Sequence, residues 1–142
     1  MEKLLVAVDG SDSALRAVRY AATLGKRAGN VSLHLVNVHE PPLIYGEIAV
    51  YVPREKMQAL QREHSEAILA NAEAIVKSEG VPYTKEICVG NAAEVLAEQA
   101  GKLSCNAIVM GTRGLSSIGN LVMGSVATKV IHLTDLPVTL IK

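Results

Sequence analysis

The segment from Gly111 to Ser125 has the composition of a loop that binds an anion. It carries glycines at positions 111, 114, 119 and 124 and joins a short apolar run to a helical pattern. Glycine lets a ligand approach backbone N–H groups without a Cβ in the way. Ser125 is a good N-cap for the next helix, whose free N–H groups and dipole favour phosphate. Phosphate binding is therefore favoured over a loop that needs glycine only to turn. Further hydroxyl donors come from Thr112, Ser116, Ser117 and Ser125.

Known phosphate signatures fit this loop only in part. Gly114 and Gly119 have the spacing of the first two glycines of a P-loop. The following residues are Asn120 and Leu121, where a P-loop has lysine and serine or threonine. Without that lysine and the magnesium-binding hydroxyl, nucleotide hydrolysis of the P-loop kind is not expected. The first apolar run is not followed by GxGxxG, the fingerprint of dinucleotide binding.

A second distinctive turn is Asp9-Gly10-Ser11, directly after an apolar run. Its aspartate could serve as a turn or capping residue, but a ligand contact is the favoured interpretation. Cys88 and Cys105 are too far apart for a CxxC motif, and the histidines have no spacing that suggests a metal. We expect no catalytic residues and no metal ligands among these side chains.

The elements that must position these turns alternate regularly along the chain. Continuous apolar runs are typical of strands buried on both faces, and amphipathic stretches between them predict helices. The first helix follows Ser11 or Asp12, the two capping candidates, and Gly25 and Gly29 close it. The other predicted elements are strands 4–8, 31–38, 83–89, 107–110 and 137–141, and helices 54–78, 91–101 and 125–133.

Two further features of this pattern concern the middle of the chain. The connector 39–53 contains three prolines and is longer than usual, which makes it a candidate lid or binding loop. The helix that follows is expected to face the core through one apolar stripe. The predicted inward positions are Met57, Leu60, His64, Ala67, Ile68 and Ile75.

Strands that alternate with helices imply an α/β fold, with a parallel sheet covered on both faces. Ligands of such open sheets bind beyond the carboxyl ends of the strands, where the strand order reverses. Both distinctive turns follow strands, so both are candidates for this position. The sequence shows no repeat or linker, and we expect a single domain over 1–142.

Composition excludes several classes of function. Lys and Arg total 14 and Asp and Glu total 14, and the only aromatic residues are four tyrosines. A nucleic-acid partner is not expected, because it would call for a basic excess and stacking rings. The chain has no apolar stretch of about 18 residues, and the run at its start is too short for a signal peptide. A cytoplasmic protein without a membrane partner is expected.

The glycine spacing resembles a known signature. Gly111-x-x-Gly114, nine residues and then Gly124-Ser125 is the pattern of the nucleotide-binding universal stress protein family. The resemblance covers nearly the whole chain and includes 6–11, 36–38, 109–114, 124–127 and 136–138. It implies a Rossmann-like sheet with strand order 3-2-1-4-5, which would place Asp9 beside Gly111.

The resemblance also implies an ATP site. By position, Asp9 and the backbone of Val38 would contact adenine and ribose, while Ala7 and Met110 would line the pocket. Arg113 is a further candidate for a phosphate contact and is the only cation of its loop. The residues that would hold ribose and phosphates are Gly111, Gly114, Gly124, Ser125 and Val126.

Because 115–123 carries no charge, phosphate binding would depend on backbone N–H groups, hydroxyls and the helix dipole, with Mg²⁺ as a candidate companion. ADP or AMP could then compete with ATP. The family commonly dimerises through its last strand, here 138–141. The sequence therefore predicts a homodimeric, ATP-binding regulatory protein of the stress response, whose protein partners it does not identify. The alternatives are a slow ATPase or self-phosphorylating protein, and a nucleotide-free dimerisation module.

Overall fold

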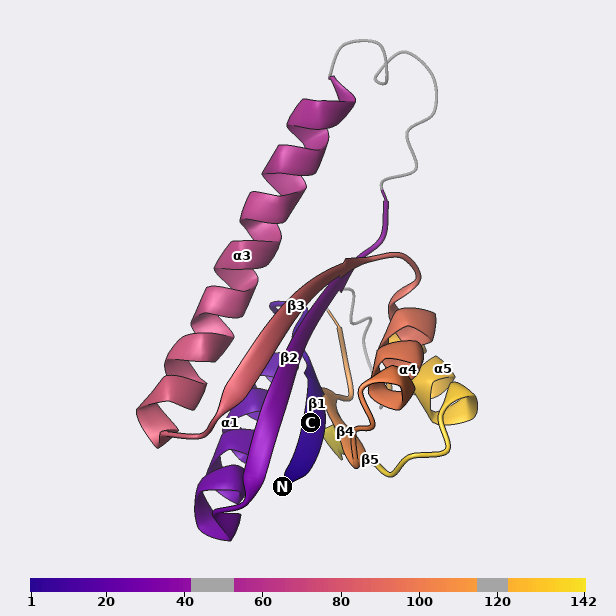
Figure 1. Ribbon diagram of the computed structural model, residues 1–142. Helices are drawn as coiled ribbons and strands as arrows, with labels where there is room; N and C mark the ends of the chain where they lie inside the picture. The colour runs from indigo at the N-terminus through magenta and orange to yellow at the C-terminus, as the bar shows by residue number, and fades with distance from the viewer. Residues whose placement is uncertain (42–52, 115–122) are drawn as a thin grey trace.

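The computed structural model describes residues 1–41, 53–114 and 123–142, which form a three-layer α/β domain (Figure 1). Its five parallel strands have the order β3-β2-β1-β4-β5, so the predicted fold class and strand order are confirmed. The strands are β1 (Glu2–Ala7), β2 (Val31–His39), β3 (Tyr83–Val89), β4 (Ala107–Gly111) and β5 (Val138–Ile141). The helices described are α1 (Asp12–Ala28), α3 (Arg54–Glu79), α4 (Ala92–Lys102) and α5 (Ser125–Leu133).

Two apolar clusters, one on each face of the sheet, hold the layers together. Helices α1 and α3 cover one face and α4 and α5 the other (Figure 1). Alternate residues of each strand go to opposite clusters, as Val6 and Leu5 of β1 do. This alternation decides which strand residues can reach a ligand on a given face.

Helix α1 begins and ends at the predicted signals. The Ser11 hydroxyl accepts a hydrogen bond from Ala14 N at 3.2 Å, and Gly29 ends the helix in the left-handed conformation with φ 76°. Gly25, the other predicted end, lies inside the helix. A Cβ there would be 3.0 Å from Val81, so glycine is needed for close packing at this position.

The predicted core face of α3 is correct at Ile68 and Ile75, which pack against the core cluster, and wrong at Leu60, His64 and Ala67. The buried residues are Ser65, Leu69, Ala72 and Val76, whereas Leu60, His64 and Ala67 are exposed and Met57, Ile68 and Ile75 are half-buried. The buried face includes the small residues Ser65 and Ala72, which hydropathy does not identify. Ser65 is tolerated inside because its hydroxyl lies 3.2 Å from His39 Nδ1. The first turns of α3 extend beyond the sheet and have no core to face (Figure 1).

Four strands differ by one or two residues from their predicted bounds: β1 begins two residues earlier and ends one earlier, β2 and β4 each end one later, and β5 begins one later. β1 ends at Ala7, although Val8 is buried and still donates to Val36 O at 2.9 Å. β5 begins at Val138 because Pro137 has no N–H to donate, while its carbonyl still accepts from Ile108 N. These small differences leave the two candidate turns where they were predicted, directly after β1 and β4.

Glu73 of α3 joins this helix to β3 and gives a first prediction. Its carboxylate accepts hydrogen bonds from Lys85 Nζ at 2.7 Å and Tyr83 Oη at 2.6 Å, and these bonds lower its pKa from the ordinary value of 4.5. A carboxylate with a lowered folded-state pKa stabilises the fold above its unfolded pKa, and this stabilisation is lost as the pH falls through the folded value.

We therefore expect Glu73→Gln to reduce the free energy of unfolding modestly at neutral pH, since ion pairs near the surface contribute little. The difference from the wild type should shrink as the pH falls below 4.5, where the wild-type carboxylate is progressively protonated. Urea unfolding of both proteins at several pH values measures this. An equal difference at neutral and acid pH would contradict it.

Candidate functional site

The carboxyl ends of β1, β2 and β4 border a cavity of about 310 Å³ that is closed on the other side by α4 and α5. This volume lies in the range of small-molecule sites, about 300–1,000 Å³. All the site residues predicted from the sequence line this cavity: Ala7, Asp9, Val38, Met110, Gly111, Arg113, Gly114, Gly124, Ser125 and Val126. The two distinctive turns, about 100 residues apart in sequence, therefore meet at one place.

Sequence reasoning missed several lining residues, most of them small or aliphatic. The strand alternation could have identified Val36, because it lies two residues before Val38 on the same face of β2. The contributions of α4 required the tertiary structure. The lining residues that were not predicted are Val8, Ala14, Val36, Ala92, Leu96 and Ala127, and Thr112 was named only as a hydroxyl donor of the loop.

The inner part of the cavity is apolar. Val36 and Val38 of β2 face Met110 of β4 across Ala7, and Leu96 of α4 completes this wall. Such a surface accepts the faces of a flat ring and offers it no charged group. The polar residues lie at the other end, where the two turns meet.

The backbone of Val38 is placed to bind a ligand edge. Leu33 donates to Pro82 O and His39 accepts from Gly90 N, so odd-numbered residues of β2 bond toward β3 and even-numbered residues toward β1. β1 ends before it reaches Val38. The carbonyl of Val8 accepts a hydrogen bond from Asn37 Nδ2 at 2.8 Å. Among the described residues, no group forms a hydrogen bond with the Val38 N–H or C=O on the side of β1.

The two carboxylate oxygens of Asp9 have different surroundings. Oδ1 accepts from Ser11 N at 2.9 Å and from the Ser11 hydroxyl at 2.5 Å, which is the local turn role that the sequence left open. Oδ2 makes no hydrogen bond to any described residue, and it would lie 3.1 Å from a Cβ at Gly114. This oxygen therefore faces the glycine turn and is available to a ligand.

The turn needs its glycines for the space that a missing Cβ leaves and not for an unusual backbone conformation. Gly111, Gly114 and Gly124 do not have the positive φ that would require glycine. A Cβ at Gly124 would lie 3.3 Å from Thr112 O and 3.5 Å from Gly114 N, so the start of α5 packs directly on the turn. The result is a surface made of backbone atoms, as expected for an anion cradle.

The predicted N-cap of α5 is wrong by one residue. Gly124 is the N-cap, Ser125 is the first helical residue, and no side chain caps this end. Gly124 takes the cap position because its N–H bonds to Thr112 O at 2.5 Å, which fixes the chain against the turn. The first N–H groups of α5 are therefore left without a side-chain partner at the cavity wall.

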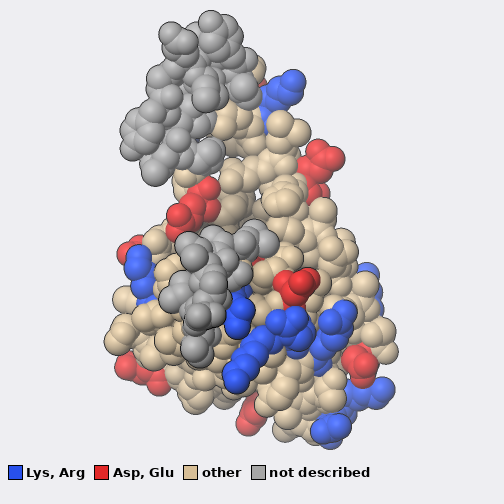
Figure 2. All heavy atoms as spheres, turned by 180° about the vertical axis from the view of Figure 1, so that it is seen from behind, with Lys and Arg blue, Asp and Glu red and all other residues tan. Residues whose placement is uncertain are grey.

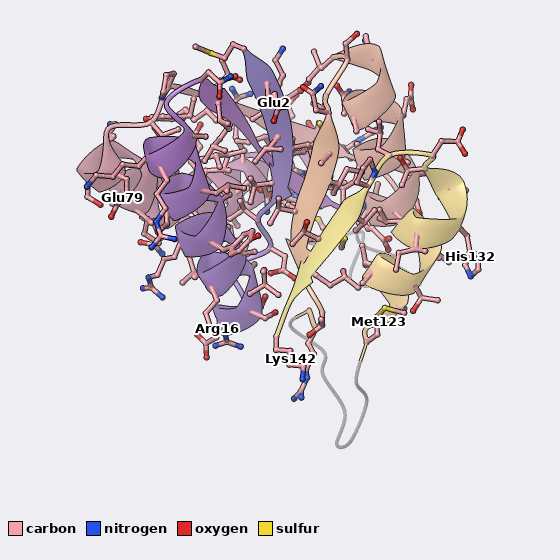
Figure 3. All side chains as sticks on the ribbon, turned by 90° about the horizontal axis from the view of Figure 1, so that it is seen from below. Glu2, Arg16, Glu79, Met123, His132 and Lys142 are labelled. Carbon is pink, nitrogen blue, oxygen red and sulfur yellow. The ribbon has the colours of Figure 1, made fainter. Side chains whose placement is uncertain are left out.

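Cations stand at the outer rim near this polar end. Arg113 is exposed, and Lys142 follows Ile141, whose carbonyl accepts from Thr112 N at 2.8 Å. Arg16 of α1 donates to Lys142 O at 2.5 Å, and the two residues lie close together in Figure 3. Seen from behind, several Lys and Arg side chains lie close together on the lower half of the surface (Figure 2). The rim thus favours an anionic ligand.

Other candidates from the sequence lie away from the cavity or outside the described residues. Burial, with Glu86 nearby, raises the pKa of Cys88 to about 11, and burial also raises the pKa of Cys105, so neither is a nucleophile at neutral pH. In the described ranges no cluster of His, Cys, Asp and Glu could bind a metal ion, and none of the helices could cross a bilayer. Most of the connector 39–53, with 115–122, lies outside the described residues.

The comparisons with known proteins agree with this geometry. The family model described as the universal stress protein family matches residues 1–142. The chain belongs to the universal stress protein family. The resemblance inferred from the glycine spacing is therefore confirmed, and the match covers both candidate turns.

Individual members of the universal stress protein family are similar along their whole length. A universal stress protein of Thermus aquaticus is 35% identical over 98% of this chain and 97% of its own. The universal stress protein UspA of Lactobacillus plantarum shares the fold, with a TM-score of 0.82 at 21% identity over 99% of this chain and 97% of that one.

Several solved universal stress proteins carry a nucleotide. The protein from Archaeoglobus fulgidus, in complex with dAMP, is 27% identical to this chain. It covers 100% of this chain and 98% of its own length, with a TM-score of 0.68. A nucleotide is therefore a ligand of a relative with the same fold.

Proposed function

We propose that this universal stress protein binds ATP in the cavity at the ends of β1, β2 and β4 and acts as a nucleotide-dependent regulator of a stress response. The observation that carries the proposal is the meeting of a backbone cradle with an apolar slot. Gly114 and Gly124 form the cradle with the start of α5, and Asp9 stands opposite Gly114.

Adenine is the base that suits the inner part. Val38 offers one N–H donor and one C=O acceptor on the same edge of β2. Adenine carries an amino donor next to ring-nitrogen acceptors, whereas guanine presents a carbonyl acceptor in place of the amino group. We therefore expect ATP to bind more tightly than GTP.

The phosphates would lie at the polar end. The free N–H groups of the α5 start and the N–H groups of the glycine turn suit a phosphate, and Arg113 adds a positive charge at the rim. We expect Mg²⁺ to bind only together with the phosphates, because the described side chains form no metal site alone. ADP and AMP share most of these contacts and should compete with ATP.

Titration calorimetry tests this function. Purified, nucleotide-free protein is titrated with ATP, ADP, AMP and GTP, with and without Mg²⁺. We expect saturable binding of the adenine nucleotides and weaker binding of GTP. Failure of ATP to bind at millimolar concentration would overturn the proposal and favour a nucleotide-free interaction module.

A second prediction concerns Asp9. Asp9→Ala removes Oδ2, which faces Gly114, and also the turn that Oδ1 makes with Ser11. We expect ATP affinity to fall by about 1–3 kcal/mol, the usual effect of losing one or two hydrogen bonds. Asp12→Ala is the matched control, because Asp12 is an exposed carboxylate of the same segment that does not line the cavity. Equal affinities of the Asp9 variant and the wild type would contradict this role.

The regulatory part of the proposal includes a homodimer through β5. This edge strand has the sequence Val-Thr-Leu-Ile and carries no charge, and an uncharged edge can pair with its own copy. Ile108 N and Thr112 N donate to Pro137 O and Ile141 O, so odd-numbered residues of β5 bond toward β4 and even-numbered residues face the free edge. Sedimentation of the wild type and of Leu140→Pro, which removes a backbone donor from that free edge, tests this assembly. A wild-type monomer at high concentration would exclude it.

A further inference from the structure

The strongest unassigned feature near the cavity is the hydroxyl of Ser13, which joins α1 to the glycine turn. Ser13 is 5% exposed, and its Oγ donates to Arg113 O at 2.6 Å, a contact between residues 100 positions apart. The Ser11 hydroxyl lies 3.4 Å from the same carbonyl but already has a shorter bond to Asp9 Oδ1. A hydroxyl has one hydrogen to donate, so Ser13 is the main partner of this carbonyl.

The hydrogen bond from Ser13 also sets the orientation of the Gly114 N–H. The peptide bond between Arg113 and Gly114 is planar and trans, so its N–H points in the direction opposite to its C=O. Because Ser13 holds the carbonyl toward α1, the N–H of Gly114 is directed to the other side of the turn. A Cβ built on Gly124 would be 3.5 Å from Gly114 N, so the start of α5 lies next to this peptide.

The fit around Ser13 leaves little freedom for another arrangement. A Cβ at Gly111 would lie 2.9 Å from the Ser13 carbonyl carbon, so β4 ends directly on the first turn of α1. The neighbouring peptide is held as well, because Thr112 N donates to Ile141 O at 2.8 Å. Within the described part of the turn, 111–114, the Arg113–Gly114 peptide is the one whose carbonyl is held by a side chain, that of Ser13.

We propose that Ser13 is a positioning residue for anion binding: its hydroxyl holds the Arg113 carbonyl and thereby aims the Gly114 N–H at the phosphate of a bound nucleotide. The inference rests on the proposed function and adds to it the residue that orients one donor of the cradle. Ser13 itself does not contact the ligand. It sets the affinity for the phosphate and leaves the affinity for the nucleoside unchanged.

The test compares AMP with adenosine by calorimetry in the wild type and Ser13→Ala. We expect the variant to bind AMP about tenfold more weakly, the effect of one hydrogen bond to a charged group, and to bind adenosine as the wild type does. Ser78→Ala is the matched control, because its hydroxyl also donates to a backbone carbonyl, Ile75 O at 2.7 Å, but on the exposed surface of α3. Both affinities should be unchanged in that control.

The outcomes separate the two proposals. If the wild type binds AMP and Ser13→Ala binds it equally well, or loses adenosine affinity to the same extent, the positioning role is wrong and the nucleotide site stands. If the wild type binds neither ligand, the proposed function fails and the positioning role fails with it. Should Ser13→Ala not fold, Ser13→Cys keeps a side chain of similar shape with a much weaker donor, and the same comparison is made with it.

Discussion

Gly114→Val and Gly124→Val are each expected to abolish nucleotide binding while the protein remains folded. A Cβ at Gly114 would lie 3.1 Å from Asp9 Oδ2, and one at Gly124 would lie 3.3 Å from Thr112 O. Valine adds two methyl groups beyond that Cβ, and they would occupy the space between the turn and the start of α5. Neither glycine has a positive φ, so the backbone itself tolerates the change.

The measurement is calorimetry with ATP, together with circular dichroism and thermal unfolding. We expect affinity to fall by at least roughly a hundredfold, since several contacts with the phosphates are lost together. Gly101→Val is the matched control, because a Cβ at Gly101 of α4 meets no atom within 4 Å. Binding that survives at both cradle positions would show that the phosphates lie elsewhere.

Gly111→Ala is expected to damage the fold itself, which separates this glycine from its two neighbours in the motif. Its Cβ would lie 2.3 Å from Ser13 Oγ and 2.9 Å from the Ser13 carbonyl carbon, so the backbone of α1 or β4 must move. Forcing an extra methyl into a packed site typically costs about 1–3 kcal/mol, and a backbone contact places this case at the upper end. Urea unfolding measures the loss.

A double substitution distinguishes this clash from other causes. Ser13→Gly removes the Oγ and Cβ with which the new methyl collides, so the pair Gly111→Ala and Ser13→Gly should be less unstable than the sum of the single changes. Gly101→Ala, in open space, should not lower stability and should raise it slightly, because alanine is the better helix former. Strict additivity of the pair would contradict the proposed contact.

Much of this fold could be predicted because its signals are local. The helix 125–133 was predicted with the observed bounds, and the strand 83–89 likewise, because apolar runs and turn residues delimit them. The face of α3 could be predicted from hydropathy only in part: Ile68 and Ile75 do pack against the core. Its buried residues include Ser65 and Ala72, and its first turns have no sheet beneath them to enforce an apolar stripe.

The site was predicted from a spacing of glycines, but the reason for each glycine was not. Sequence alone could not distinguish Gly111, which makes room for Ser13, from Gly114 and Gly124, which leave room beside Asp9 and the turn. It also could not show that Ser13 meets Arg113, because a contact across 100 residues depends on which strands are neighbours. Nor could it reveal that a glycine and not Ser125 caps α5.

The strand order has a consequence for how large an assembly of this protein can become. The sheet has two outer strands with opposite characters: β3 exposes Thr84 and Lys85 beside Glu86, whereas β5 carries no charged residue. Charged side chains on an edge strand hinder pairing with another chain, whereas an uncharged edge strand can pair. If two molecules pair through β5, the uncharged edge strand of each is covered, and only the charged edge strand β3 of each remains at the outside of the combined sheet. Growth would then stop at a pair, and the sheet would not extend into a fibre.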